Sequence, residues 1–202
     1  SSGSMNYASD GITKFDYACT LTASLAYLIL KQQDAAGVVT FSNRIEAFIP
    51  PRAKRDYLIQ ILHALENRGP AGDTDVGKIL DDIAGQIKRR GLVILVSDLL
   101  DEPAGIVKGL RQFRFKGNDV IVFHLLDQAE LDLPFDGNIL FEDLEAAELR
   151  VVADPRAIRS TYRAVVQEFI TEMRKQCHDN AIDYQLISTA TPLDQALASY
   201  LS

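Results

Sequence analysis

Four hydroxyl or carboxyl side chains stand where strands are expected to end and helices to begin, and their oxygens could bind one metal ion. Ser2 and Ser4 form an S-x-S pair ahead of the first expected helix. Thr74 precedes the third expected helix, and Asp98 follows the apolar run "LVILVS". Hard oxygen donors suit Mg²⁺, with Mn²⁺ as a substitute, and Mg²⁺ needs few protein carboxylates. This set therefore predicts a magnesium site anchored by Asp98.

Each of these residues also has a purely structural explanation. Residues 1–5, "SSGSM", resemble a flexible chain end or the remnant of a tag. Asp73 or Thr74 would cap a helix N-terminus without any ion. Asp98 is different, because a carboxylate directly after a buried strand needs an ion, a lysine or backbone N–H groups as its partner. The residues alone leave these alternatives open.

Alternating strand and helix patterns must bring the four side chains together. Helices are expected at 14–32, 54–67, 75–89, 103–115, 155–178 and 192–201. Strands are expected at 35–41, 45–49, 92–96, 120–126 and 183–187. This alternation predicts an α/β fold with a doubly wound, mostly parallel open sheet and helices on both faces. Ligands of such sheets gather at the carboxyl ends of the strands, where all four residues are expected.

Three parts of the chain are expected to depart from this alternation of strands and helices. Strand 45–49 alternates like a half-exposed antiparallel edge strand, and Pro50 and Pro51 should stop it. Residues 127–153 read as a small β excursion within a single domain that spans residues 1–202. The first helix has no strand before it, so the sequence looks cut just after a central strand. Such a loss would leave a gap lined with unpaired backbone groups.

Composition and motifs exclude several classes of function. A net charge of -7 and a pI near 5.0 argue against a nucleic-acid binder. Cys19 and Cys177 form no CxxC motif, and no run is apolar enough to cross a bilayer, so we expect a cytoplasmic protein. We expect no enzyme, because the G-x-S-x-G, Walker A and G-x-G-x-x-G motifs are missing.

The four positions resemble the metal-ion-dependent adhesion site of von Willebrand factor A-like domains. That motif reads D-x-S-x-S, then a distant Thr, then a distant Asp at a strand end. Ser2, Ser4, Thr74 and Asp98 match it, whereas the leading Asp would stand immediately before Ser1. The resemblance implies that these residues hold Mg²⁺ and that an acidic side chain of a partner completes the coordination.

A narrower resemblance covers nearly the whole chain. The segments "RGLVILVSDLLDE" and "VFHLLDQAELDLPFDGNILFEDLE" are similar to the bacterial domain-of-unknown-function family fifty-eight. That family carries a von Willebrand A-like domain and is usually encoded beside MoxR-type AAA+ ATPases. The resemblance implies a Mg²⁺-dependent protein-interaction domain that partners such an ATPase in a chaperone-like or assembly role. A non-metallated scaffold of the same fold is the alternative, and a hydrolase is a minor one.

Overall fold

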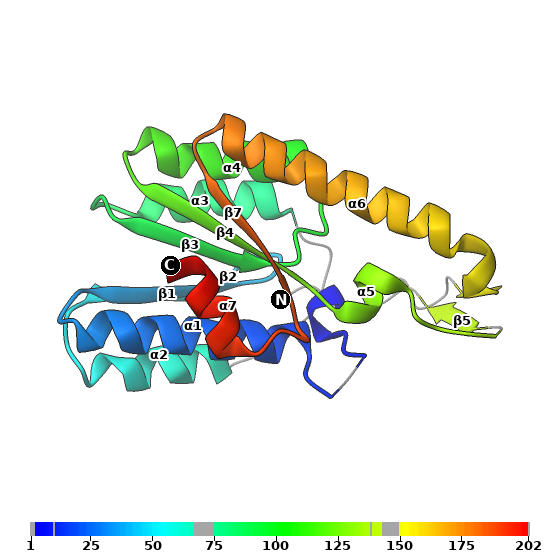
Figure 1. Ribbon diagram of the computed structural model, residues 1–202. Helices are drawn as coiled ribbons and strands as arrows, with labels where there is room; N and C mark the ends of the chain where they lie inside the picture. Colours follow the sequence, from blue (N-terminus) through cyan, green and yellow to red (C-terminus); the bar gives the residue numbers. More distant parts are fainter. Residues whose placement is uncertain (1–2, 10, 67–74, 138, 143–149, 202) are drawn as a thin grey trace.

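A parallel three-stranded sheet forms the centre of the protein (Figure 1). The computed structural model describes residues 3–9, 11–66, 75–137, 139–142 and 150–201. The sheet has the order β3-β4-β7, with β3 at Leu92–Ser97, β4 at Asp119–Leu126 and β7 at Asp183–Ser188. Two antiparallel pairs accompany it: β1 (Ala36–Phe41) with β2 (Ile45–Arg52), and β5 (Ile139–Glu142) with β6 (Arg150–Ala153).

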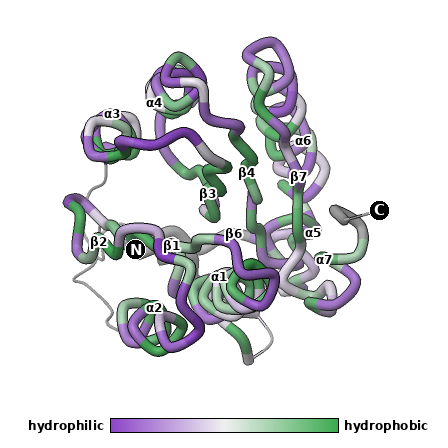
Figure 2. The backbone as a smooth tube through the Cα atoms, turned by 90° about the vertical axis from the view of Figure 1, so that its left-hand side faces the viewer, coloured by the Kyte–Doolittle hydropathy of each residue, from purple (hydrophilic) through white to green (hydrophobic). Residues whose placement is uncertain are grey.

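Helices cover both faces of the sheet (Figures 1 and 2). On one face lie α3 (Val76–Gln86), α4 (Pro103–Phe115) and α6 (Pro155–Asp179). On the other lie α1 (Lys14–Lys31) and α7 (Leu193–Leu201), with α2 (Tyr57–Glu66) packed against α1 and the β1–β2 pair. Two short helices, η1 (Gly3–Asn6) and α5 (Gln128–Asp132), lie before α1 and after β4.

The sequence of β4 is apolar without alternation because the strand is buried on both of its faces. Seven of its eight residues are buried. Val120 and Val122 pack into the cluster with α3, α4 and α6, whereas Ile121 and Phe123 pack into the cluster with α1 and α7. Because β4 also pairs with a strand on each side, both its faces and both its edges are enclosed.

The structure confirms the expected α/β class, with a parallel sheet between two layers of helices. Thr13 caps α1 through its hydroxyl, which accepts a hydrogen bond from the N–H of Asp16 at 3.0 Å. The β excursion at 127–153 contains the β5–β6 pair as predicted, but it also contains α5, which the sequence analysis missed.

Two local predictions are wrong. Pro50 and Pro51 do not end the second strand, since β2 continues to Arg52. In the part of the chain that the structure describes, β2 pairs with β1 alone, so it is an edge strand that tolerates the missing proline N–H groups. The cap of α3 is neither Asp73 nor Thr74. Asp75 caps it, and its carboxylate accepts a hydrogen bond from the N–H of Lys78 at 2.9 Å.

Candidate functional site

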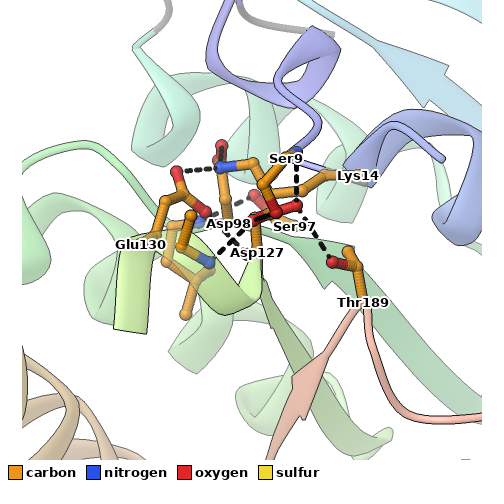
Figure 3. A network of polar contacts seen from close by, with 9 residues as sticks. Ser9, Lys14, Ser97, Asp98, Asp127, Glu130 and Thr189 are labelled. Carbon is orange, nitrogen blue, oxygen red and sulfur yellow. Dashed lines mark hydrogen bonds and ion pairs between the residues drawn. The ribbon is translucent and has the colours of Figure 1, made fainter. Parts of the chain in front are cut away.

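The carboxyl edge of the parallel sheet holds a cluster of charged and hydroxyl side chains (Figure 3). Asp98 directly follows β3, Asp127 directly follows β4, and Thr189 directly follows β7. Parallel strands end at the same edge, so these three positions converge even though up to 91 positions separate them in the sequence. Lys14 joins them because α1 begins at this edge.

Lys14 is the positive centre of the cluster. Its Nζ lies 3.0 Å from Oδ2 of Asp98 and 2.7 Å from Oε1 of Glu130. The side chains of Lys14, Asp98 and Glu130 are 0%, 4% and 20% exposed. One fully buried ammonium group therefore bridges a buried carboxylate and a partly exposed one. We name Lys14, Asp98 and Glu130 the lysine triad.

Asp127 forms a second, adjoining set of contacts. Its carboxylate accepts hydrogen bonds from the N–H and the hydroxyl of Ser9, from the N–H of Ala129 and from the hydroxyl of Thr189. Burial by itself would raise the pKa of Asp127, but these hydrogen bonds together outweigh burial and hold the pKa below its ordinary value. These hydrogen bonds thus favour the ionised form of Asp127.

Glu130 links the two sets. Its Oε2 accepts a hydrogen bond from the N–H of Asp127 at 2.7 Å, which completes a capping box at the start of α5. Its Oε1 contacts Lys14. Burial raises the pKa of Glu130, and the charge of Lys14 opposes this effect. The short helix α5 therefore fixes one partner of Lys14 in place.

The loop after β3 holds Asp98 in a constrained position. Leu99 is fully buried and has a φ of 54°, in the left-handed region that a leucine rarely adopts. The hydroxyl of Ser97 accepts a hydrogen bond from the N–H of Leu99 at 3.1 Å. The carboxylate of Asp101 accepts one from the N–H of Val76 at 2.7 Å, which ties the start of α3 to this loop.

The predicted metal ligands have different outcomes in the structure. Ser2 and Thr74 lie outside the described residues. Ser4 lies in η1, where its carbonyl accepts a hydrogen bond from the N–H of Tyr7 at 3.1 Å. Asp98 lies at the end of β3 as predicted, buried, with a lysine as its partner. Asp98 and Met5, the neighbour of Ser4, line the same cavity.

Sequence reasoning missed Lys14, Asp127 and Glu130. A signal existed for the acidic pair, because Asp127 follows an apolar strand just as Asp98 does, and the spacing D-x-x-E is that of a capping box. No comparable signal marked Lys14, because a lysine at the first position of a helix is ordinarily solvated. Only the packing of α1 against the sheet buries it.

The donor chemistry of this edge is partly compatible with Mg²⁺. Asp98 offers the carboxylate oxygen that such an ion requires, and hydroxyls and water can fill other positions. Within the described residues, however, no group of three or more His, Cys, Asp or Glu side chains could hold a metal ion. The ammonium of Lys14 already contacts Oδ2 of Asp98, so an ion bound at Asp98 would lie close to a positive charge.

Comparison with known proteins gives a family and a fold. Residues 1–171 match the family described as "Protein of unknown function DUF58". Uncharacterized proteins of Mycobacterium tuberculosis (strain H37Rv) and Mycobacterium bovis are 23% identical over 164 residues, which cover 80% of this chain and 51% of each relative. The chain thus spans about half the length of these relatives.

Solved structures share the fold across almost the whole chain. The conserved hypothetical protein BatB from Bacteroides thetaiotaomicron has a TM-score of 0.64 at 15% identity, covering 99% of this chain and 91% of that one. An aerotolerance-related membrane protein from Bacteroides fragilis has a TM-score of 0.65 at 14% identity, covering 99% and 92%. At such low identity the likeness concerns the fold alone. In the part of this chain that the structure describes, no helix has the length and apolarity of a membrane span.

Proposed function

We propose that this chain, which belongs to the family of unknown function DUF58, is a protein-interaction domain that recognises its partner at the carboxyl edge of its parallel sheet. The observation that carries the proposal is the lysine triad beside Asp127, a buried charged cluster at the edge where open α/β sheets bind their ligands. Buried charge is costly, and charge concentrated at such an edge is a common sign of a functional site.

The first form of the proposal is a Mg²⁺-dependent domain of von Willebrand A-like, doubly wound fold. Asp98 would hold the ion directly or through water, and the hydroxyls of Ser2, Ser4 and Thr74 would contribute further oxygens. An acidic side chain of the partner would complete the octahedron, and a MoxR-type AAA+ ATPase is the proposed partner. In this form Lys14 would stay paired with Glu130, since the ammonium group and the ion would compete for Asp98.

A second candidate is a scaffold of the same fold that needs no metal. The contact of 3.0 Å between Lys14 and Asp98 favours it, since the ammonium already neutralises the carboxylate that would anchor an ion. In this form Lys14 is a permanent internal cation, and the partner binds to the same edge through ordinary polar contacts.

Isothermal titration calorimetry with MgCl₂ and MnCl₂ separates the two forms when every protein is extended upstream by one strand, so that the position immediately before Ser1 is present. The metal-dependent form predicts saturable binding to the wild-type protein, tighter binding to Lys14→Met, and no binding to Asp98→Asn. Asp119→Asn is the matched control, because Asp119 is an exposed carboxylate at the opposite end of the sheet, paired with Arg114. Circular dichroism establishes that each variant is folded. Heat changes that do not saturate in either the wild type or Lys14→Met would reject the metal-dependent form.

Partner binding is tested separately. The wild-type protein, immobilised on resin, is challenged with a purified MoxR-type ATPase in the presence of MgCl₂ or EDTA. Retention lost in EDTA supports the metal-dependent form, and equal retention supports the scaffold. The absence of retention in both buffers rejects the ATPase as the partner.

A further inference from the structure

Basic side chains gather near the amino edge of the parallel sheet, at the end opposite to the lysine triad. Residues 83–97 and 103–118 together contain seven of the 21 Lys and Arg residues and none of the 28 Asp and Glu residues. Helices α3 and α4 end at this edge, and β3 and β4 begin there (Figure 1). A third of the positive charge of a chain with a net charge of -7 therefore lies in two short segments.

The two segments contact each other directly. The N–H of Gly91 donates a hydrogen bond to Oδ1 of Asn118 at 3.0 Å, and the N–H of Asp119 donates one to the carbonyl of Gly91 at 3.0 Å. The side chain of Arg90 lies against Gly117, where an added Cβ would be 2.9 Å from its Nε. The exposed basic and aromatic side chains of both segments thus form one surface. We name this surface the basic corner, and it consists of Lys88, Arg89, Arg90, Arg111, Phe115 and Lys116.

Phe115 is the apolar part of the basic corner. At 75% it is the most exposed large hydrophobic residue among the side chains that the structure describes. It is the last residue of α4 and precedes the turn at Gly117, which has a φ of 80°. The guanidinium of Arg111, one turn earlier in α4, lies 5.7 Å from the centre of the ring. The helix end therefore presents an aromatic ring and a cation together to the solvent.

The ends of the helices explain only part of this cluster. Cations are favourable near a helix C-terminus. Lys116 contacts the carbonyl of Ala84 at the end of α3, and Arg114 pairs with Asp119 at 2.7 Å. Residues 88–90, in contrast, form no ion pair and no side-chain hydrogen bond with any residue that the structure describes. Their charges are free for an external partner, and no helix end requires an exposed phenylalanine beside them.

An anionic lipid surface is the partner that fits this chemistry best. Flexible Lys and Arg side chains contact phosphate headgroups without a fixed geometry, and an apolar ring enters the boundary between headgroups and acyl chains. A specific acidic peptide would instead need preorganised, paired arginine groups. Single-stranded nucleic acid would need several aromatic rings for its successive bases, whereas the basic corner has one.

The acidic remainder of the protein is compatible with such a contact. The lysine triad is separated from the basic corner by the length of β3, six residues or roughly 20 Å. Screening by salt at physiological ionic strength acts over about 8 Å, so these carboxylates have little effect at the basic corner. Asp179 and Asp183 also lie at the amino edge, but they stand at the end of α6 and the start of β7, beyond β4.

We propose that the basic corner docks this protein on an anionic membrane surface, with the ring of Phe115 inserted among the headgroups. The contact is peripheral, and it lies at the opposite end of the sheet from the edge at which a protein partner is proposed to bind. The proposal does not rest on the proposed function. Its tests contain EDTA throughout, so a metal ion at Asp98 cannot affect them.

Co-sedimentation with lipid vesicles measures the charge dependence. The wild-type protein should sediment with vesicles of phosphatidylglycerol and phosphatidylcholine in low salt. It should stay in solution in high salt or with phosphatidylcholine alone, because the attraction is electrostatic. The triple variant Lys88→Gln/Arg89→Gln/Arg90→Gln should lower the partition coefficient by about ten-fold or more.

A second triple variant controls for net charge. Arg44→Gln/Lys78→Gln/Arg156→Gln also removes three exposed cations, but these lie outside the basic corner. Its partition coefficient should stay within about three-fold of the wild type, since only local charge acts at the membrane. Circular dichroism establishes that both triple variants are folded.

Insertion of the ring is measured separately by fluorescence. The chain contains no tryptophan, so Phe115→Trp introduces one fluorophore at the basic corner. Its emission should shift to shorter wavelength when phosphatidylglycerol vesicles are added. Tyr27→Trp is the matched control, because Tyr27 is also exposed on a helix, at 50%, with the ammonium of Lys31 at 5.8 Å from its ring. The emission of this control should not change.

Four outcomes would overturn the proposal. The wild type may fail to sediment with the anionic vesicles in low salt, or the two triple variants may lose binding equally. An unchanged emission of Phe115→Trp in the presence of sedimenting vesicles would show that the ring does not insert. Tighter binding of the wild type to polyglutamate or to an oligothymidylate than to the vesicles would assign the basic corner to an acidic protein or a nucleic acid.

Discussion

At the scale of single residues, Lys14 is the positive charge around which the carboxylates of the carboxyl edge are arranged. A fully buried ammonium is unfavourable unless its partners compensate for the lost water, and Asp98 and Glu130 do so at 3.0 and 2.7 Å. The triad carries one positive and two negative charges when all three groups are ionised. This residual negative charge lies beside Asp127, which hydrogen bonds already satisfy. With Asp127 the edge has three carboxylates and one ammonium group, so it is acidic, and hydrogen bonds satisfy the carboxylate that Lys14 does not contact.

Replacing Lys14 with methionine should leave Asp98 buried without its counter-charge. We expect a loss of about 3–5 kcal/mol in the free energy of unfolding, the usual cost of breaking one side of a buried ion pair. Urea denaturation at pH 7 measures this loss. The double variant Lys14→Met/Asp98→Asn should recover part of it, because the unpaired charge is gone. A single variant that loses less than about 1 kcal/mol would show that Lys14 is not the partner on which Asp98 depends.

His124 should make stability depend on pH. It is fully buried in β4, its Nδ1 lies 2.5 Å from the hydroxyl of Tyr184, and burial lowers its pKa to about 4. Above about pH 6.5 the imidazole is neutral in both the folded and the unfolded chain, so His124 causes no loss of stability. As the pH falls from about 6.5 to about 4, only the unfolded chain gains the proton, and stability falls by an amount on the order of 3 kcal/mol.

The variant His124→Asn isolates this effect. Its amide can occupy the place of Nδ1 near Tyr184 but does not titrate. Urea denaturation between pH 7 and pH 4 should therefore give a shallower loss of stability in the variant than in the wild type. Parallel pH profiles in the two proteins would show that other groups cause the dependence.

At the scale of elements, the contact between α3 and α4 depends on glycine. A Cβ added to Gly77 would lie 2.6 Å from the carbonyl oxygen of Gly105 and 3.1 Å from its Cα. These are backbone atoms, so the added methyl group could be accepted only if the two helices moved apart. Asp101 reinforces the same junction by accepting the N–H of Val76. The loop that carries Asp98 is thus fixed by the packing of these helices.

Gly77→Ala should destabilise the protein by about 1–3 kcal/mol, the cost of overpacking. Gly85→Ala is the matched control in the same helix, because a Cβ there meets nothing within 4 Å. It should be neutral or stabilise the protein by up to about 1 kcal/mol, since alanine favours the helix. Thermal unfolding of the two variants provides the comparison, and equal melting temperatures would contradict the close approach of α3 and α4.

At the scale of the whole molecule, the core is divided into three clusters. One lies between the parallel sheet and α3, α4 and α6, and the second lies between the sheet and α1 and α7. The third lies among α1, α2 and the β1–β2 pair. Val39, Phe41 and Ile45 of the β1–β2 pair pack against the first cluster, but in the described part of the chain the pair forms no strand pairing with the parallel sheet.

Native-state hydrogen exchange should therefore find two levels of stability. We expect the amides of β4, which pairs on both sides, to exchange only through global unfolding. Amides of the β1–β2 pair should exchange through a smaller opening of lower free energy, because among the described residues the pair has no strand pairing to the parallel sheet. Exchange measured over a series of low urea concentrations distinguishes the two. The same free energy for both sets of amides would mean that the molecule opens as a single unit.

The sequence determined most of the elements, because their signals are local. The apolar runs at 92–96 and 120–126 predicted the strands β3 and β4, although only β4 is buried along nearly its whole length, and Thr13 predicted the start of α1. The position of Asp98 after a strand also fixed its place at the carboxyl edge. Local rules failed at Pro50 and Pro51, since only the sheet order shows that β2 is an edge strand, where prolines are tolerated.

The partner of Asp98 was decided by tertiary structure alone. The sequence left an ion, a lysine or backbone N–H groups as alternatives for this carboxylate. Lys14 is 84 positions away, and the packing of α1 against the sheet buries it beside Asp98 while α5 brings Glu130 to its other side. Contacts between segments so far apart in the sequence are not encoded by any local pattern, so only the folded chain brings these three side chains together.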